Sequence, residues 1–255
     1  MMESVSKIAL VTGGSRGLGK NMALRLAEKG NDVIIVYRSK AQEAAEVVAA
    51  IEALGQKAAA IQLDTADVKS FDHFFTQVSG ILKDKWNRVS FDFLINNAGI
   101  SRPSLFPETS EQDFDDLMNV HLKGVYFLSQ KALPLLADGG RIVNLSTGLA
   151  RFSTPGYAAY ASMKGAIDTL TRYMAKELGS RGITVNALAP GAIYTDFNSE
   201  SFDSHPGMTD FISSITALGR VGEPNDIGGV VAFLCSEDAR WITGQRIEVS
   251  GGMFL

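Results

Sequence analysis

The sequence predicts the α/β fold class: a single doubly wound Rossmann domain with a mostly parallel, seven-stranded sheet and helices on both faces. Two observations lead to this prediction. Short apolar runs alternate with longer amphipathic segments along the chain, and strands this apolar are typical of a parallel sheet covered on both faces. No linker, low-complexity tract or change of composition divides the 255 residues, so we expect one domain over residues 1–255.

The predicted strands and helices follow one another in β-α order. Strands are expected at residues 8–11, 33–37, 58–63, 91–95, 141–145, 184–189 and 246–249, where apolar and β-branched side chains are concentrated. Helices are expected at residues 18–29, 41–54, 70–83, 111–136, 157–180 and 224–236. Gly30, Gly55 and Gly182 stand near the ends of three helices, where a left-handed cap is common. Right-handed crossovers between such units build a doubly wound sheet.

One segment breaks this regularity. Residues 195–219 are rich in Ser, Phe and Met and lie between a predicted strand and a predicted helix. A connection of this length in a compact domain is usually functional, so we expect a lid over a binding site. Apolar side chains of the lid would form a substrate wall, with support from a Tyr before it and a Phe across the cleft. These residues are Phe197, Phe202, Met208, Phe211, Tyr194 and Phe152.

Composition narrows the class of protein. The formal net charge is −4 without a long basic run, which gives no electrostatic reason to expect nucleic acid or an anionic membrane as a partner. No apolar run approaches the ~18 residues of a membrane helix, and residues 1–10 lack the apolar core of a signal peptide. The single cysteine, Cys235, fits a reducing compartment and a small buried side chain. We expect a soluble cytoplasmic protein.

The histidines and two of the arginines give little indication of a metal site or of a charged substrate. His73, His121 and His205 are far apart in the sequence, and with one cysteine they offer no metal-ligand spacing, so we expect no metal. His73 is expected on a helix surface. Arg102 and Arg151 are candidates for a carboxylate or phosphate on the substrate, although surface arginines are common.

A glycine-rich loop follows the first predicted strand. Residues 12–19 read Thr-Gly-Gly-Ser-Arg-Gly-Leu-Gly, and a predicted helix follows. The glycines allow a tight turn and the close approach of a pyrophosphate, to which the helix N-terminus presents unpaired amides. The alternative is a plain turn, but the strand-turn-helix context is the one that a dinucleotide site requires. The predicted contacts are Gly13, Ser15, Arg16, Gly17, Leu18 and Gly19.

The end of the second predicted strand favours NADP(H) over NAD(H). NAD sites place an Asp or Glu there, roughly 20 residues after the glycine loop, to hold the ribose hydroxyls. Tyr37 and Arg38 occupy that place, and no carboxylate is available. Arg38 and Arg16 together suit a 2′-phosphate, although both are also consistent with solvated surface charges. Asp64 is placed to meet the adenine or to cap a helix.

Tyr160 and Lys164 lie one turn apart on the predicted helix 157–180. A phenol titrates near ~10 and is a poor acid at neutral pH. An ammonium group four residues further on would stabilise the phenolate and lower the phenol pKa. The pair therefore predicts a proton donor, and the alternative is a packing aromatic with a solvent-facing lysine.

These motifs, in this order, resemble the short-chain dehydrogenase/reductase family. The resemblance rests on the glycine loop, Asn96-Asn97-Ala98-Gly99, Tyr160-x-x-x-Lys164, Pro190-Gly191-x-x-x-Thr195 and the closing residues 242–252. It implies reversible hydride transfer between a nicotinamide and an alcohol or carbonyl carbon, in a homo-oligomer that is commonly a tetramer. It implies that Asn97 lines the cofactor groove and Thr195 holds the nicotinamide carboxamide. The other implied cofactor contacts are Ala98, Gly99, Tyr160, Lys164, Pro190, Gly191 and Ile193.

Two positions depart from the family's usual residues. Thr147 stands where the family has a serine, thirteen residues before Tyr160. Its hydroxyl can still donate to a carbonyl, and its neighbour Ser146 is expected to point the other way. His121 stands where the family has an asparagine that positions a water, largely through its backbone carbonyl. Asn119 is the alternative if the alignment slips by two residues.

The resulting hypothesis is an NADPH-dependent reductase of a ketone or aldehyde. Tyr160 would donate the proton, Thr147 would hold the carbonyl oxygen, Lys164 would tune Tyr160 and bind the ribose, and His121 would anchor a water. A 3-oxoacyl-thioester reductase is a narrower alternative, and a sugar-nucleotide epimerase or dehydratase is an alternative with less support. A non-catalytic NADP-sensing regulator is the alternative from another class.

Overall fold

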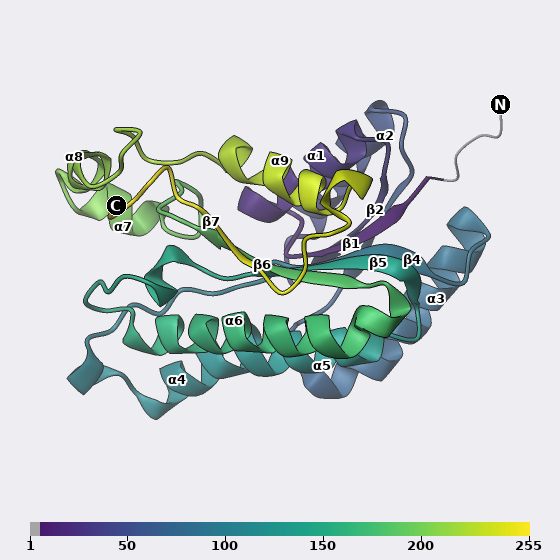
Figure 1. The fold of residues 1–255 in the computed structure, drawn as a ribbon, viewed down its shortest axis with the longest axis horizontal. Helices are drawn as coiled ribbons and strands as arrows, with labels where there is room; N and C mark the ends of the chain where they lie inside the picture. The colour runs from purple at the N-terminus through teal and green to yellow at the C-terminus, as the bar shows by residue number, and fades with distance from the viewer. Residues whose placement is uncertain (1–5) are drawn as a thin grey trace.

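Seven parallel strands form the centre of the molecule. The computed structural model describes residues 6–255, and Figure 1 shows the sheet between two layers of helices. The strand order is β3-β2-β1-β4-β5-β6-β7, the order of a doubly wound sheet, and the predicted fold class is confirmed. The strands are β1 (Ile8–Thr12), β2 (Asp32–Tyr37), β3 (Ala58–Gln62), β4 (Phe91–Asn96), β5 (Leu136–Leu145), β6 (Thr184–Pro190) and β7 (Arg246–Val249).

The two faces of the sheet are covered by different helices. One layer holds α1 (Gly17–Glu28), α2 (Ala41–Ala53) and α9 (Pro224–Leu234), and the other holds α3 (Phe71–Trp86), α4 (Glu111–Met118), α5 (Val125–Ala132) and α6 (Ala158–Leu178). Alternation along β1 divides its side chains between two apolar clusters, with Ala9 and Val11 in one and Ile8 and Leu10 in the other. All four side chains are fully buried, which explains why the strand shows no polar alternation.

The helix predicted over 111–136 is confirmed only as far as residue 132, and it is not α-helical throughout. The chain instead forms α4, then a π-helical turn over Asn119–Gly124, then α5, and β5 already begins at Leu136. Gly124 lies against the Thr65 carbonyl, where a side chain would not fit, and Pro134 lacks the amide that a longer α5 would need. The other predicted elements occur within a few residues of their expected bounds.

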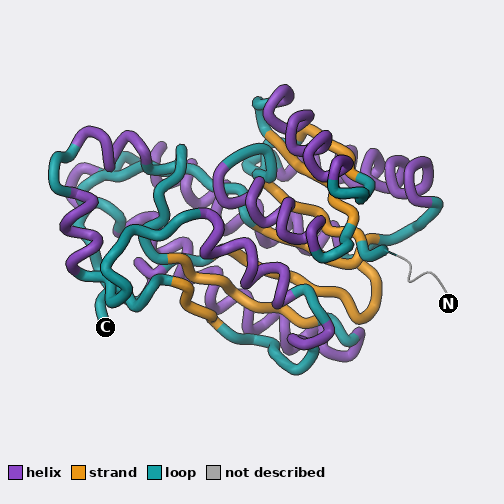
Figure 2. The backbone as a smooth tube through the Cα atoms, turned by 90° about the horizontal axis from the view of Figure 1, so that it is seen from above, coloured by secondary structure: helices purple, strands orange, loops and turns teal. Residues whose placement is uncertain are grey.

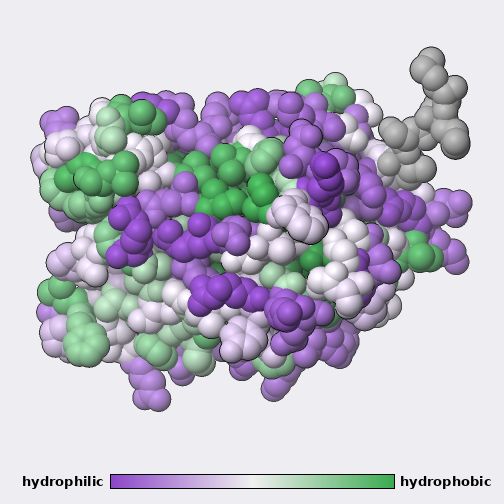
Figure 3. All heavy atoms as spheres, viewed as in Figure 1, coloured by the Kyte–Doolittle hydropathy of each residue, from purple (hydrophilic) through white to green (hydrophobic). Residues whose placement is uncertain are grey.

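The segment predicted as a lid contains two short helices, α7 (Ser199–Ser204) and α8 (Met208–Ser214). Figures 1 and 2 show it at the end of the molecule that also holds the C-terminus. An isolated bridge between Ile193 and Gly222 joins the residues on its two sides, and a second bridge joins Thr216, within it, to Met253. Figure 3 shows apolar residues gathered over this end as well as over α9.

Three smaller predictions concern single features. Cys235 is buried and burial raises the pKa of its thiol to about 12, as expected of a packed cysteine. His73 is exposed on α3, also as expected. Across residues 6–255, no helix is both long and apolar enough to cross a bilayer. The expectation for residues 1–10 falls partly outside the described residues.

Candidate active site

The predicted site residues converge on one cavity of about 590 Å³. It opens where β1, β4, β5 and β6 end, the edge at which doubly wound sheets bind ligands. All residues predicted for the site line it: Gly13, Ser15, Arg16, Gly17, Leu18, Gly19, Tyr37, Arg38, Asp64, Asn97, Ala98, Gly99, His121, Thr147, Tyr160, Lys164, Pro190, Gly191, Ile193 and Thr195.

The glycine loop is held by side chains from β1 and β4. Asn97 Nδ2 donates to the carbonyls of Thr12 at 2.9 Å and Gly13 at 3.2 Å. The Thr12 hydroxyl accepts from the amides of Asn97 and Ala98 at 2.9 and 3.0 Å. Sequence reasoning placed Asn97 in the groove and missed Thr12, although it directly precedes the glycines. Asn97 therefore braces the loop as well as lining the cavity.

The loop fits a bound pyrophosphate. Gly13 and Gly17 have φ of 64° and 54°, which a side chain rarely adopts, and Gly19 packs so closely on the Gly13 carbonyl that a Cβ has no room. The N-cap residue of α1, Arg16, makes no side-chain capping hydrogen bond, so the first amides of this helix are free for an anion.

At another part of the cavity, Arg38 follows β2 with no carboxylate beside it in the sequence, and Arg16 comes from the glycine loop after β1. Arg38 is exposed and lines the cavity beside Tyr37. Arg16 lies 3.7 Å from the carboxylate of Asp196, with both side chains more than half exposed, so the ion pair is weak. Asp64 lines the cavity, and its carboxylate accepts from the Ala66 amide at 2.9 Å. These residues fit a 2′-phosphate.

Tyr160 lines the cavity from α6. Its ring contacts Phe197, with centroids 6.3 Å apart. Burial raises the pKa of the phenol above its ordinary value, and hydrogen bonding with the Thr147 side chain opposes the shift only in part. The expected lowering of this pKa by Lys164 is wrong for this structure, because desolvation of the phenolate outweighs every favourable contact.

Lys164 is buried below Tyr160, one turn further along α6. Its Nζ donates to the Leu145 carbonyl at 2.5 Å and lies 5.8 Å from the centre of the Tyr160 ring. Burial lowers the pKa of Lys164 to about 8, and the nearby carboxylate of Asp168 opposes the shift. The lysine therefore titrates close to the physiological range.

The two neighbouring hydroxyls at the end of β5 differ in their contacts. The Thr147 hydroxyl accepts from the Leu149 amide at 3.3 Å and interacts with the Tyr160 phenol. The Ser146 hydroxyl is buried and has no hydrogen-bond partner within the described part of the chain. The structure thus pairs Thr147, rather than Ser146, with Tyr160.

His121 reaches the site because the π-helical turn directs it inward, where it is 1% exposed. Its Nε2 lies 2.8 Å from the Ile100 carbonyl oxygen, and its ring meets the Tyr160 ring edge to face. Burial and the charge of Lys164 lower the pKa of His121 to about 3, so the imidazole is neutral. Sequence reasoning found this residue but not the turn that places it.

Comparisons with known proteins agree with this geometry. A family model described as enoyl-(acyl carrier protein) reductase matches residues 13–254. The chain is 41% identical to the 3-oxoacyl-(acyl-carrier-protein) reductase FabG of Staphylococcus aureus, over 98% of this chain and 99% of that protein. The chain belongs to the short-chain dehydrogenase/reductase family.

Solved structures of this family support the same conclusion. The reductase LugOII, which catalyses keto-reduction at C1 during lugdunomycin biosynthesis, is 36% identical with a TM-score of 0.93, covering 99% of this chain and 100% of that one. The angucycline C-6 ketoreductase LanV with bound NADP is 38% identical with a TM-score of 0.92, covering 98% and 96%. The predicted oxidoreductase class and the NADP(H) cofactor are confirmed.

Within this family framework, the substrate half of the cavity is apolar. Its predicted wall residues Phe152, Phe197, Phe202, Met208 and Phe211 all line it. Tyr194 does not line it but packs against Phe202 with ring centroids 5.4 Å apart, and so supports the wall as predicted. Its hydroxyl donates to Asp203 at 3.1 Å.

The two arginines considered for a charged substrate are occupied elsewhere. Arg102 lies 3.6 Å from Asp113 and 3.9 Å from Asp116, and it does not line the cavity. Arg151 binds the Glu248 carboxylate through two nitrogens at 2.7 and 2.8 Å. Neither arginine lines the cavity and carboxylates of the chain lie beside both, which favours the alternative of surface charges for Arg102 and Arg151.

Sequence reasoning also missed the part of the site near the C-terminus. Met253 and Phe254, near the C-terminus, line the cavity beside Phe152. The Ser250-Gly251-Gly252 motif signalled the family, but nothing in the next residues showed that the chain turns back over the cavity.

Proposed function

We propose that this chain uses NADPH to reduce the carbonyl group of an uncharged, largely apolar ketone, with Tyr160 as the proton donor. The observation that carries this proposal is the position of Tyr160. Its phenol interacts with Thr147, and its ring contacts the rings of His121 and Phe197. A carbonyl group held between Thr147 and Tyr160 would leave the rest of the substrate among apolar side chains.

The chain's own residues would manage the proton and the orientation, while bound NADPH would supply the hydride. A phenol is protonated at neutral pH, which is the form that a donor needs, and burial raises the pKa of Tyr160 further above its ordinary value. Tyr160 Oη would give its proton to the carbonyl oxygen, whose basicity would rise during reduction. Thr147 would donate a hydrogen bond to the same oxygen and stabilise its growing charge.

Lys164 and His121 would act behind Tyr160. The Lys164 ammonium favours the phenolate left after proton transfer and is a suitable donor to the nicotinamide ribose. A neutral imidazole at His121 cannot supply a charge, so we assign its side chain a packing role against Tyr160. The backbone carbonyl of His121 would bind the proton-relay water.

The apolar wall and the occupied arginines favour a substrate without a carboxylate or phosphate near its carbonyl group. Residues 195–219 would close over it as a lid. A 3-oxoacyl thioester is the second candidate, because FabG, which is 41% identical, is named as a reductase of such substrates. A non-catalytic NADP sensor has less support, since Tyr160, Lys164 and Thr147 are all present.

We also propose a single domain that assembles as a homo-oligomer, commonly a tetramer in this family, with a dimer as the alternative. Large apolar side chains are exposed on α4, α5 and α6, namely Phe114, Tyr126 and Tyr173, and would suit burial against a second copy. A cytoplasmic location, where NADPH is abundant and the Cys235 thiol stays reduced, completes the proposal.

A panel of carbonyl compounds tests the proposed function. Consumption of NADPH absorbance would be measured with aryl ketones of increasing size, a β-ketoester, a 3-oxoacyl thioester, an α-keto acid and an α,β-unsaturated ketone. We expect aryl ketones to give alcohols and the α-keto acid to be a poor substrate. Preference for the α-keto acid, or saturation of the carbon–carbon double bond without alcohol formation, would contradict the proposal.

A further inference from the structure

The 250–255 segment forms part of the wall of the substrate half of the cavity. The Phe254 ring packs against the Phe152 ring with centroids 4.8 Å apart, and both residues line the cavity. Phe254 has φ of 55°, in the left-handed region that a bulky residue rarely adopts. A strained conformation of this kind persists only where neighbouring contacts hold it.

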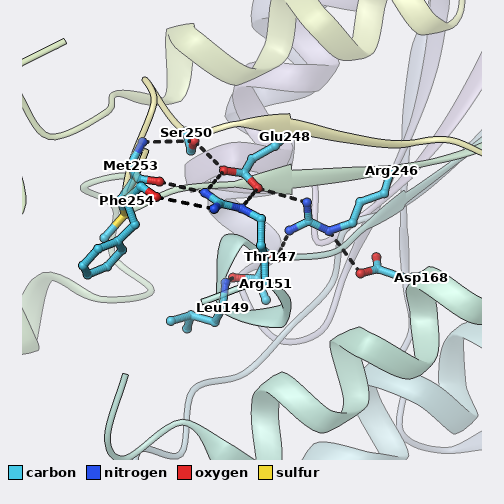
Figure 4. A network of polar contacts seen from close by, with 9 residues as sticks. All are labelled: Thr147, Leu149, Arg151, Asp168, Arg246, Glu248, Ser250, Met253 and Phe254. Atoms are coloured by element: carbon cyan, nitrogen blue, oxygen red, sulfur yellow. Dashed lines mark hydrogen bonds and ion pairs between the residues drawn. The ribbon is translucent and has the colours of Figure 1, made fainter. Parts of the chain in front are cut away.

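Arg151 provides several of these contacts (Figure 4). Its guanidinium binds the Glu248 carboxylate bidentately and donates to the Met253 carbonyl at 2.8 Å and the Phe254 carbonyl at 3.5 Å. Its Cζ lies 5.4 Å from the centre of the Phe152 ring. One arginine therefore contacts both aromatic residues of this wall.

Glu248 extends the same network toward Thr147. It accepts from Arg246 at 3.0 Å, and Arg246 donates in turn to the Thr147 carbonyl at 2.8 Å and to Asp168 of α6 at 3.1 Å. Hydrogen bonds from Arg151, and then from Arg246 and Ser250, outweigh burial and lower the pKa of Glu248 to about 2. The carboxylate is thus charged wherever the protein is folded near neutral pH.

The 250–255 segment is also joined to the lid. The Phe254 amide donates to the Ile215 carbonyl at 2.8 Å, and the Leu218 amide donates to the Gly251 carbonyl at 3.0 Å. The segment therefore lies between the 195–219 lid and the loop that begins at Thr147.

We propose that Arg151 is a positioning residue that sets which substrates fit: by holding the 250–255 segment, it keeps the Phe152–Phe254 wall in place for a bulky apolar ketone. This inference rests on the proposed function. Arg151 does not contact the reacting atoms and acts only through the segment. Without the hydrogen bonds of the Arg151 guanidinium, Phe254 can leave the left-handed conformation. The wall then loses its fixed position. A large ketone, which packs against the wall, is affected more than a small one.

The test compares the largest aryl ketone that the wild-type protein reduces with a small β-ketoester, ethyl acetoacetate. For Arg151→Gln, we expect the ratio of kcat/KM, large over small, to fall about tenfold, through a higher KM for the large ketone. Arg151→Lys keeps the charge but not the planar fork of the guanidinium. Its ratio should lie between those of the wild-type protein and Arg151→Gln. Phe254→Ala should give the same fall as Arg151→Gln, and the double variant should fall no further, because both act on one wall.

Arg181 offers a matched control. It also binds one carboxylate, of Asp138 at 2.7 Å, and two backbone carbonyls, but none of these residues lines the cavity. Arg181→Gln should leave the ratio unchanged. The inference would be overturned if Arg151→Gln and Arg181→Gln gave the same ratio. It would also be overturned if the ratio of the double variant fell by the product of the two single effects. If the wild-type protein reduced neither ketone, the proposed function itself would fail.

Discussion

The imidazole of His121 meets the phenol ring of Tyr160 edge to face, with centroids 5.0 Å apart and ring planes at 90°. The π-helical turn over Asn119–Gly124 makes this contact possible by directing His121 into the protein. An edge-to-face contact restrains the orientation of the phenol without taking or giving a proton. The identity of the residue at this position therefore affects how well Tyr160 is held.

A first prediction concerns the role of His121. His121→Asn keeps the backbone carbonyl but removes the ring contact with Tyr160. We expect kcat to fall by less than about tenfold, because general acid–base groups contribute about 10² or more and this side chain would not be one. Steady-state kinetics with a ketone measure the effect. A loss of about 10³ in kcat would instead assign proton transfer to the imidazole.

A second prediction concerns pH. The pKa of Lys164 is lowered to about 8, whereas that of Tyr160 is raised above its ordinary value, so Lys164 loses its charge first as pH rises. We expect the rate of ketone reduction to be highest below pH 8 and to decline above it with an apparent pKa near 8. In Lys164→Arg the guanidinium stays charged, so any remaining activity should lack this decline. An unchanged alkaline limb in that variant would assign the titration to another group.

A third prediction separates the two coenzymes. Arg38→Asp should raise the KM for NADPH by about 10- to 100-fold, the range for losing a hydrogen bond to a charged group, and change the KM for NADH far less. Asp196→Asn removes the carboxylate beside Arg16 and should lower the KM for NADPH slightly. Arg172→Asp, on the exposed face of α6, is the control. Equal effects of Arg38→Asp on both coenzymes would argue against a 2′-phosphate at this site.

A fourth prediction concerns the brace on the glycine loop. Asn97→Ala leaves the carbonyls of Thr12 and Gly13 without their donor, which should cost about 1–3 kcal/mol of unfolding free energy. The KM values for NADPH and NADH should rise together, unlike in Arg38→Asp, because the loop contacts parts common to both. Urea unfolding and coenzyme kinetics measure the two effects. Wild-type stability with a raised KM would mean that Asn97 binds the coenzyme without bracing the loop.

The sheet and most of the site could be predicted because local patterns determine them. The strand β1 is apolar on both faces and is followed by glycines, and these two features suffice for a strand, a tight turn and an anion-binding helix start. Tyr160 and Lys164 could be paired because a helix repeats every 3.6 residues. Such features need no knowledge of distant residues.

The parts that sequence reasoning missed depend on distant contacts. The π-helical turn at Asn119–Gly124 includes a glycine that lies against the Thr65 carbonyl, a contact that no helical pattern reveals. The direction of the Tyr160 pKa depends on burial by other segments. The carboxylate that binds Arg151 belongs to Glu248, 97 residues away in the sequence, and no local pattern indicates this contact.

Tyr160→Phe tests the central claim most directly, because it removes one oxygen atom and keeps the ring that contacts His121 and Phe197. NADPH binding would be measured by fluorescence titration and ketone reduction by NADPH consumption. We predict an unchanged dissociation constant for NADPH and a loss of turnover by about 10² or more. Turnover close to that of the wild-type protein, with NADPH bound, would contradict the assignment of Tyr160 as the proton donor.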